Sequence, residues 1–243
     1  MKSRWAWGWT ATYPLFKWIL RIKVHGRENV PTKGPVIIAS NHASFFDPPL
    51  IGHAAKRECF FLAKEELFGQ SKFFRWLIEY FNSIPIKRGK AFDIHLFKEV
   101  DRLIKLKQAL VIFPEGTRSR TGEFLPFKEG VGLIALRYNI PVVPAYIKNT
   151  YKPWQEWLRR DSRVEVFLDE AMHPGERSKE KEKYEAFTRK VEEKIHRLRD
   201  IAWEGEKRFE KQCGEFYNTP HYDYVKTLKT RMPKGAAAKP KRA

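Results

Sequence analysis

The sequence predicts a single α/β domain in which a central, mostly parallel (mixed) sheet is flanked by helices. Two observations support this fold class. Short apolar runs typical of buried strands alternate with segments whose apolar residues recur every three or four positions, as in helices. This alternation extends from about residue 34 to residue 170, and strands that alternate with helices favour a parallel sheet. A length of 243 residues suits one such domain with additional segments at its ends.

Each predicted element follows from one of these two patterns. The predicted strands are 36–39, 59–63, 83–86, 110–113, 142–147 and 164–168, and the predicted helices are 48–55, 72–81, 92–107 and 130–138. The segment 72–81 is apolar on nearly every side. It is therefore expected to be a buried core helix or a second membrane-contacting patch, with the buried helix favoured.

The N-terminal 25 residues are predicted to form a helical membrane-binding segment that lies in the interface of a bilayer. Aromatic residues of the interface-seeking kind alternate there with basic ones: Trp5, Trp7, Trp9, Tyr13, Phe16 and Trp18 with Lys2, Arg4, Lys17, Arg21 and Lys23. The segment is too short and too charged to span a bilayer comfortably. The alternative is an aromatic arm that packs on the domain.

The α/β domain is predicted over 26–175, followed by a charged amphipathic helix over 176–212 and a basic, disordered tail over 213–243. The net charge of +18 is spread along the chain and favours an anionic partner, which could be nucleic acid, an anionic membrane or a phosphorylated substrate. The two cysteines, Cys59 and Cys213, lie far apart, which argues against a disulfide framework and a cysteine zinc site. No secretory signal is recognisable. The expected location is the cytoplasmic face of a membrane, as a monotopic or peripheral protein.

A candidate catalytic pair follows the strand 36–39. His42 comes just after this strand, and Asp47 lies at the predicted start of the next helix. A histidine can accept and return a proton near neutral pH, and a carboxylate bonded to its second ring nitrogen fixes its tautomer. The structural alternative remains open, because Asp47 before Pro48 is also a good helix cap.

A second polar loop, Pro114 to Arg120, follows the strand 110–113. Glycine lets the backbone approach a ligand closely, and an arginine fork suits phosphate, so Gly116 and Arg118 are candidate ligand contacts. In open α/β sheets, ligands bind at the carboxyl ends of the strands, where both loops are expected. Arg88 follows the strand 83–86 and is also assigned to phosphate, whereas Arg120 and Lys90 are interpreted as solvated surface charges. Secondary candidates for the site are Asn41, Lys64 and Lys128.

These blocks together resemble the glycerolipid acyltransferases, and most of all the bacterial 1-acylglycerol-3-phosphate acyltransferases. The resemblance covers roughly residues 22–150. An Asn-His-x-x-x-x-Asp block is matched by Asn41, His42 and Asp47, and a Phe-Pro-Glu-Gly-Thr-Arg-Ser block is matched throughout 113–119. Residues 84–88 resemble a middle block of the family pattern. Pro85 and Lys87 depart from that pattern, which weakens the assignment of Arg88 to phosphate binding. A Val-Pro segment is matched at 141–144.

The resemblance implies transfer of an acyl chain from acyl-CoA or acyl-carrier protein to the 2-hydroxyl of lysophosphatidic acid, which gives phosphatidic acid. It implies that His42 is the general base and that Asp47 orients it. Glu115, Gly116, Thr117 and Arg118 would shape the acceptor site, with Arg118 and Arg88 on the phosphate. Neither a metal nor a cofactor is expected. An alternative is another acceptor, such as glycerol 3-phosphate, a lysophospholipid or a lyso-aminolipid. A nucleic-acid-binding protein is a remote alternative, because no binding module is recognisable.

Overall fold

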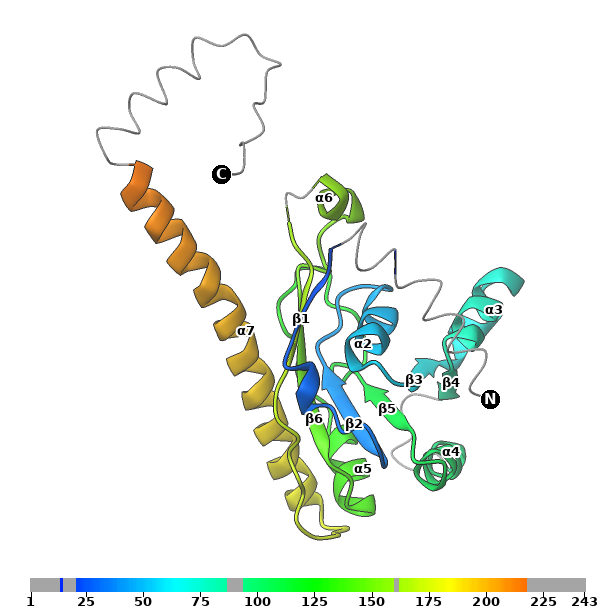
Figure 1. Cartoon of the computed structure of the whole chain (residues 1–243). Coiled ribbons are helices and arrows are strands. Elements are labelled where there is room, and N and C mark those ends of the chain that lie inside the picture. Colours follow the sequence, from blue (N-terminus) through cyan, green and yellow to red (C-terminus); the bar gives the residue numbers. More distant parts are fainter. Residues whose placement is uncertain (1–13, 15–20, 87–93, 160–161, 218–243) are drawn as a thin grey trace. The chain divides into compact units, whose positions relative to one another are not determined.

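The structure is a computed structural model that describes residue 14 and residues 21–86, 94–159 and 162–217. Its centre is a seven-stranded sheet with the strand order β1-β7-β6-β2-β5-β3-β4, shown in Figure 1. The strands are β1 (Lys23–His25), β2 (Val36–Ser40), β3 (Cys59–Lys64), β4 (Ser83–Ile86), β5 (Ala109–Ile112), β6 (Val142–Lys148) and β7 (Glu165–Leu168). The chain divides into two units, Met1–Arg199, which holds the whole sheet, and Asp200–Ala243.

The helices of the described residues connect and follow these strands. The α-helices are α2 (Asp47–Ala55), α3 (Lys72–Tyr80), α4 (Ile94–Lys105), α5 (Gly130–Tyr138), α6 (Trp154–Arg159) and α7 (Lys181–Tyr217), and the 3₁₀ turns are η2 (Arg27–Asn29) and η3 (Glu65–Gly69). Within this part of the chain, no helix is both long and apolar enough to cross a membrane.

The predicted fold class is confirmed, because the sheet is mixed and mostly parallel. Neighbouring strands run parallel throughout, except that β6 and β7 are antiparallel. The six predicted strands form within one or two residues of their expected ends. β1 and α6 were not predicted because both are short: β1 has three residues and α6 has six, too few to show a period.

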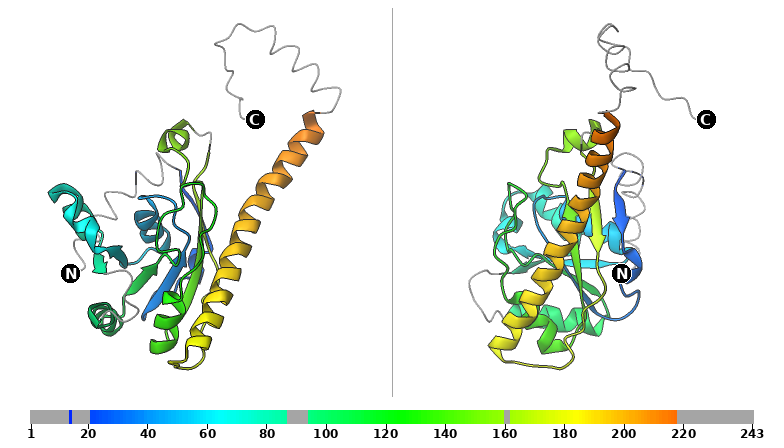
Figure 2. Two further views of the ribbon diagram at one scale, coloured as in Figure 1. Left: turned by 180° about the vertical axis from the view of Figure 1, so that it is seen from behind. Right: turned by 90° about the vertical axis from the view of Figure 1, so that its left-hand side faces the viewer.

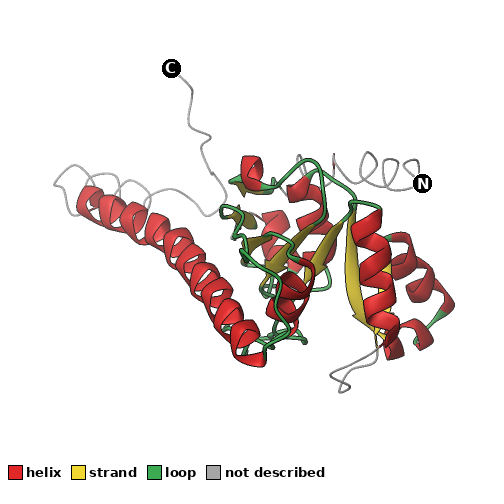
Figure 3. Cartoon of the chain, turned by 90° about the horizontal axis from the view of Figure 1, so that it is seen from below, coloured by secondary structure: helices red, strands yellow, loops and turns green. Residues whose placement is uncertain are grey.

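The sheet separates two apolar cores. One face is covered by α2, whose Leu50 and Ile51 belong to the same buried apolar cluster as Val36 and Ile38 of β2. The other face is covered by α4, α5 and the first part of α7, where Ile195 lies among the buried residues. Figure 2 shows these helices from two further sides, and Figure 3 shows the strands lying between helices. Because both faces are covered, the central strands are fully buried and read as continuous apolar runs.

The favoured interpretation of the segment 72–81 as a buried core helix is wrong. None of the residues of α3 is buried, and Phe73 and Trp76 are 71% and 53% exposed. The helix lies at the β4 end of the sheet, packed on η3 and β4, where neighbouring elements reach only part of its surface. An apolar helix at the edge of a sheet has no second layer to cover its outer side.

Two predicted segments fall mostly outside the described residues. These are the N-terminal segment 1–25, of which residue 14 and residues 21–25 are described, and the tail 213–243, of which the backbone to residue 217 continues α7. The helix predicted over 176–212 corresponds to α7, and its stripe of Tyr184, Phe187, Val191, Ile195 and Leu198 is buried.

Two helical glycines give a test of the close packing of α5 on α7. A Cβ on Gly132 would overlap the Tyr184 carbonyl oxygen and lie 2.6 Å from Thr188 Oγ1, which also accepts a hydrogen bond from the Gly132 amide. A Cβ on Gly52 of α2 would meet only Phe61 Cζ, at 4.0 Å. We therefore expect Gly132→Ala to lower the free energy of unfolding by about 1–3 kcal/mol. The control Gly52→Ala should raise it by about 0.5–1 kcal/mol.

Chemical denaturation of the two variants beside the parent protein measures both effects. Equal changes in the free energy of unfolding for the two glycines would contradict the packing of α5 against α7.

Candidate active site

The two polar loops predicted to form the site lie side by side because β2 and β5 are neighbours at the centre of the sheet. These strands are parallel, and Ala39 pairs with Ile112. His42 lies three residues after Ala39, and Glu115 lies three residues after Ile112. Both residues therefore follow the carboxyl ends of their strands at the same level of the sheet. Neighbouring parallel strands thus bring together residues that are 73 positions apart in the sequence.

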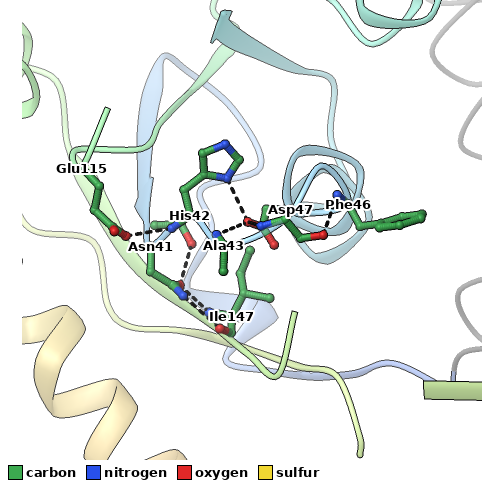
Figure 4. A network of polar contacts seen from close by, with 9 residues as sticks. Asn41, His42, Ala43, Phe46, Asp47, Glu115 and Ile147 are labelled. Carbon is green, nitrogen blue, oxygen red and sulfur yellow. Dashed lines mark hydrogen bonds and ion pairs between the residues drawn. The ribbon is translucent and has the colours of Figure 1, made fainter. Parts of the chain in front are cut away.

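His42 and Asp47 form a hydrogen-bonded pair. His42 Nδ1 lies 2.8 Å from Asp47 Oδ2, which also accepts hydrogen bonds from the amides of Ala43 (2.6 Å) and Ser44 (2.7 Å), as Figure 4 shows in part. The Asp47 side chain is fully buried, whereas the His42 side chain keeps 17% of its surface exposed. An ionised carboxylate only accepts hydrogen bonds, so the ring donates through Nδ1 and its Nε2 is left as the acceptor.

The main chain of His42 is fixed from both sides by the loop after β5. Its amide donates to Glu115 Oε1 at 2.8 Å, and its carbonyl accepts from the Ser119 amide at 2.8 Å. The second carboxylate oxygen of Glu115 accepts from the Leu125 amide at 3.1 Å. Glu115 is 3% exposed, and both of its carboxylate oxygens accept hydrogen bonds from backbone amides. Its contact with the His42 amide therefore holds the two loops together.

Asn41 ties the same loop to the next strand. Its Nδ2 donates to the Ile147 carbonyl at 3.0 Å, and its Oδ1 accepts from the Ile147 amide at 2.7 Å, so the side chain replaces a strand partner for β6. Asn41 is 5% exposed, and an amide that both donates and accepts is the side chain suited to this position. Asn41 thus fixes the start of the loop that carries His42.

Phe113 supports the imidazole ring and was missed as a site residue by the sequence analysis. Its ring stacks on His42 with a centroid distance of 4.2 Å and an angle of 20° between the planes. Ser119 was also missed, because it acts through its main chain. The position of Phe113, directly after a predicted strand and next to the Pro-Glu-Gly loop, was the signal that could have indicated it.

Lys128 lies over the glycine of the second loop. Gly116 has a φ of +69°, which favours glycine, and a Cβ there would lie 2.9 Å from Lys128 Nζ. The Lys128 amide donates to the Pro114 carbonyl at 2.9 Å, which holds this segment beside the loop. The glycine therefore makes room for an ammonium group at the edge of the candidate acceptor site.

Arg118 provides a second cation in the same loop. Its guanidinium lies 3.5 Å from the centre of the Phe45 ring, a cation–π contact that links the two loops. Partial burial and the nearby charge of Arg120 lower the pKa of Arg118 below its usual value. Thr117 and Arg118 are both exposed, so they can meet a ligand from solvent.

The remaining candidates are placed less directly. Lys64 ends β3, half-buried, and pairs with Glu66 at 3.0 Å. Because β3 and β4 are paired with Lys64 opposite Ile86, both strands end at the same level of the sheet. Arg88, two residues beyond Ile86, lies outside the described residues.

A family model described as Acyltransferase matches residues 21–148, which is more than half of the chain. The chain belongs to the acyltransferase family. This confirms the resemblance stated above. The match includes both loops of the candidate site and ends at Lys148, the last residue of β6.

Three relatives of this acyltransferase share the same name. A 1-acyl-sn-glycerol-3-phosphate acyltransferase of Cocos nucifera is 37% identical over 151 residues, which cover 58% of this chain and 46% of that protein. One of Saccharomyces cerevisiae is 38% identical over 54% of this chain and 44% of that protein. One of Pseudomonas aeruginosa is 31% identical over 63% and 60%, respectively. The chain thus spans about half the length of the curated relatives it matches.

A solved structure is also similar. The 1-acyl-sn-glycerophosphate (LPA) acyltransferase PlsC from Thermotoga maritima aligns with a TM-score of 0.61 and 28% identity over 82% of each chain. This similarity extends to the α/β fold as a whole, beyond the two loops of the site.

The carboxyl group of Glu115 has a raised pKa in this acyltransferase. Burial raises its pKa to about 7, and the negative charge of Asp47 raises it further, while the bonds from the His42 and Leu125 amides act against the rise. The folded protein therefore holds a proton that the unfolded chain releases between about pH 4.5 and pH 7. His53 acts in the opposite sense, because burial and the charge of Arg27 lower its pKa to about 4.

The contribution of Glu115 to the free energy of unfolding should therefore fall as pH rises from about 4.5 through 7, by at most about 1.4 kcal/mol per pH unit. Glu115→Gln has no proton to release, so the difference in free energy of unfolding between the parent and this variant should shrink over that range. Denaturation curves at pH 5, 6, 7 and 8 measure the difference, from which the contribution of His53 cancels. A difference that stays constant with pH would contradict the raised pKa.

Proposed function

We propose that the protein transfers a fatty acyl chain from an acyl thioester to the 2-hydroxyl of lysophosphatidic acid, which yields phosphatidic acid. The observation that carries this proposal is the His42–Asp47 pair, held at 2.8 Å beside a loop with exposed cations. Membership of the acyltransferase family and the names of its relatives support the substrate class.

In the proposed reaction, His42 acts as the general base. Its Nε2 accepts the proton of the acceptor hydroxyl as the hydroxyl oxygen attacks the thioester carbonyl carbon. The tetrahedral intermediate then breaks its carbon–sulfur bond, and the proton on His42 passes to the departing thiolate. Asp47 stabilises the imidazolium that exists between these two transfers. No residue is acylated, because the hydroxyl attacks the thioester directly.

The phosphate of the acceptor is proposed to bind at the cations of the second loop. Arg118 presents a planar fork of donors that suits phosphate, and its stacking on Phe45 limits the directions in which the fork can point. Lys128 beside Gly116 adds a second positive charge. Arg88 and Lys64, at or beyond the ends of β4 and β3, are candidates for a third contact.

Two parts of this proposal have alternatives that the same site would serve. The donor can be acyl-CoA or acyl-carrier protein, since both present a thioester. The acceptor can be another molecule with a hydroxyl near a phosphate, such as glycerol 3-phosphate or a lysophospholipid, or a lyso-aminolipid. We further propose that the protein works at the cytoplasmic face of a membrane, where a lysolipid acceptor resides, and that the segment 1–25 contributes to membrane binding. We propose that the reaction needs neither a metal nor another cofactor.

Removal of the proposed base should abolish turnover without unfolding the protein. We expect His42→Ala to lower kcat by about 10²- to 10⁴-fold in an assay with lysophosphatidic acid and acyl-CoA. His25→Ala is a matched control, because His25 lies on β1 and pairs with Glu165 away from the site. A His42→Ala enzyme with more than a tenth of parental turnover would refute the role of His42.

Loss of the arginine fork should weaken acceptor binding in a way that depends on phosphate. Arg118→Lys keeps the charge but loses the fork and the stacking on Phe45, so KM for lysophosphatidic acid should rise about tenfold to a hundredfold. KM for 1-monoacylglycerol, which lacks phosphate, should change little. Arg120→Ala is the control, since Arg120 is exposed and interpreted as a surface charge. Equal effects on both acceptors would contradict a phosphate contact.

A further inference from the structure

Two helices beside the candidate active site carry large apolar side chains that are exposed. On α3, Phe73 is 71% exposed and Trp76 is 53% exposed. On α6, Trp154 is 51% exposed and Leu158 is 43% exposed. Single exposed apolar residues are common on protein surfaces, but a set gathered beside a functional site indicates an interaction surface.

The helix α3 has two apolar sides, of which the domain uses one. Its inner side bears Phe74, Leu77 and Ile78, which are half-buried. Its outer side bears a row of rings at helical spacing, with centroid distances of 6.0 Å from Phe73 to Trp76 and 5.6 Å from Trp76 to Tyr80. Packing on the domain therefore accounts for the inner side, and it leaves Phe73 and Trp76 of the outer row largely exposed.

The loop that carries His42 contacts both α3 and α6. Phe45 and Phe46 are neighbours in this loop and are 52% and 41% exposed. Phe45 meets Phe74 of α3 edge to face, with a centroid distance of 5.7 Å, and Phe46 meets Trp157 of α6 at 5.4 Å. The loop thus contacts α3 through Phe74 and α6 through Trp157. The exposed apolar residues of these three neighbouring segments are called the aromatic rim, and they are Phe45, Phe46, Phe73, Trp76, Trp154 and Leu158.

Basic side chains lie on the same segments as the aromatic rim. Arg118 lies directly over the Phe45 ring, Lys72 and Arg75 are exposed on the polar side of α3, and Arg159 is exposed at the end of α6. The acidic residue on the polar side of α3, Glu79, is bonded to Arg75 at 2.8 Å. Aromatic rings flanked by lysine and arginine are the pattern that favours the interface of an anionic bilayer.

We infer that the aromatic rim is a docking surface for an anionic lipid bilayer. The rings would enter the interface beside the loop that carries His42, and the cations would lie at the level of the headgroups. A lysolipid phosphate could then reach Arg118 while its acyl chain stays in the bilayer. The inference rests on the proposed function for the identity of the acceptor, but the surface itself is argued from exposure, ring contacts and charge.

The test uses the full chain and measures binding to vesicles of equimolar phosphatidylglycerol and phosphatidylcholine by flotation. We expect the double variants Phe73→Ser/Trp76→Ser and Trp154→Ser/Leu158→Ser each to bind about tenfold more weakly than the parent. Trp76→Phe keeps an aromatic ring and should retain binding. Leu106→Ser is the matched control, since Leu106 is 47% exposed but follows α4, near the amino end of β5. Circular dichroism and the thermal midpoint check that each variant is folded.

Unchanged vesicle binding by both double variants, or failure of the parent to bind these vesicles, would overturn the inference. So would a change from dimer to monomer in the variants with vesicle binding intact, because the rim would then be a contact between two copies of the chain. Flotation needs no turnover, so the two proposals fail separately. A protein that binds vesicles through the rim but acylates no lysophosphatidic acid keeps the docking surface and loses the proposed function.

Discussion

The arrangement of the site depends on two hydrogen bonds that hold the main chain of His42. Glu115 accepts from its amide and the Ser119 amide donates to its carbonyl, both at 2.8 Å. These bonds form because β2 and β5 are neighbouring parallel strands that end at one level. A base must be placed to within about an ångström of the proton it takes. A loop pinned by one side only would not supply that accuracy, and the second loop pins this one while it also presents Arg118.

Glu115 shows why an acid occupies the centre of this arrangement. A buried carboxylate is costly unless its oxygens are hydrogen-bonded. Each oxygen of Glu115 accepts a hydrogen bond from a backbone amide, one from His42 and one from Leu125. A glutamine could not do this, because one end of its amide group donates. The raised pKa shows that the two bonds compensate the cost of burial only in part. Glu115 was predicted to shape the acceptor site, which stays a prediction; its observed contacts are with the backbone amides of His42 and Leu125.

The parts of the structure that could be predicted are those marked by a pattern within a short stretch of sequence. Continuous apolar runs predicted β2, β5 and β6 because both faces of the sheet are covered, and the polar loops after β2 and β5 marked the edge where a site forms. The stacking of Phe113 on His42 and of Arg118 on Phe45 depends on how two distant loops approach, which no local pattern reports. The exposure of α3 was missed for another reason, since a helix in the core and one at a bilayer interface can share one apolar composition.

The position of Asp47 at the start of α2 combines a structural and a chemical requirement. The first turn of α2 contains Pro48 and Pro49, which lack the amide hydrogens that a capping side chain would satisfy. The Asp47 carboxylate is therefore free to turn back to the loop, where the amides of Ala43 and Ser44 and the ring of His42 all donate to one oxygen. Helix capping and support of the histidine were alternatives in the sequence. The two prolines make the first unnecessary and so permit the second.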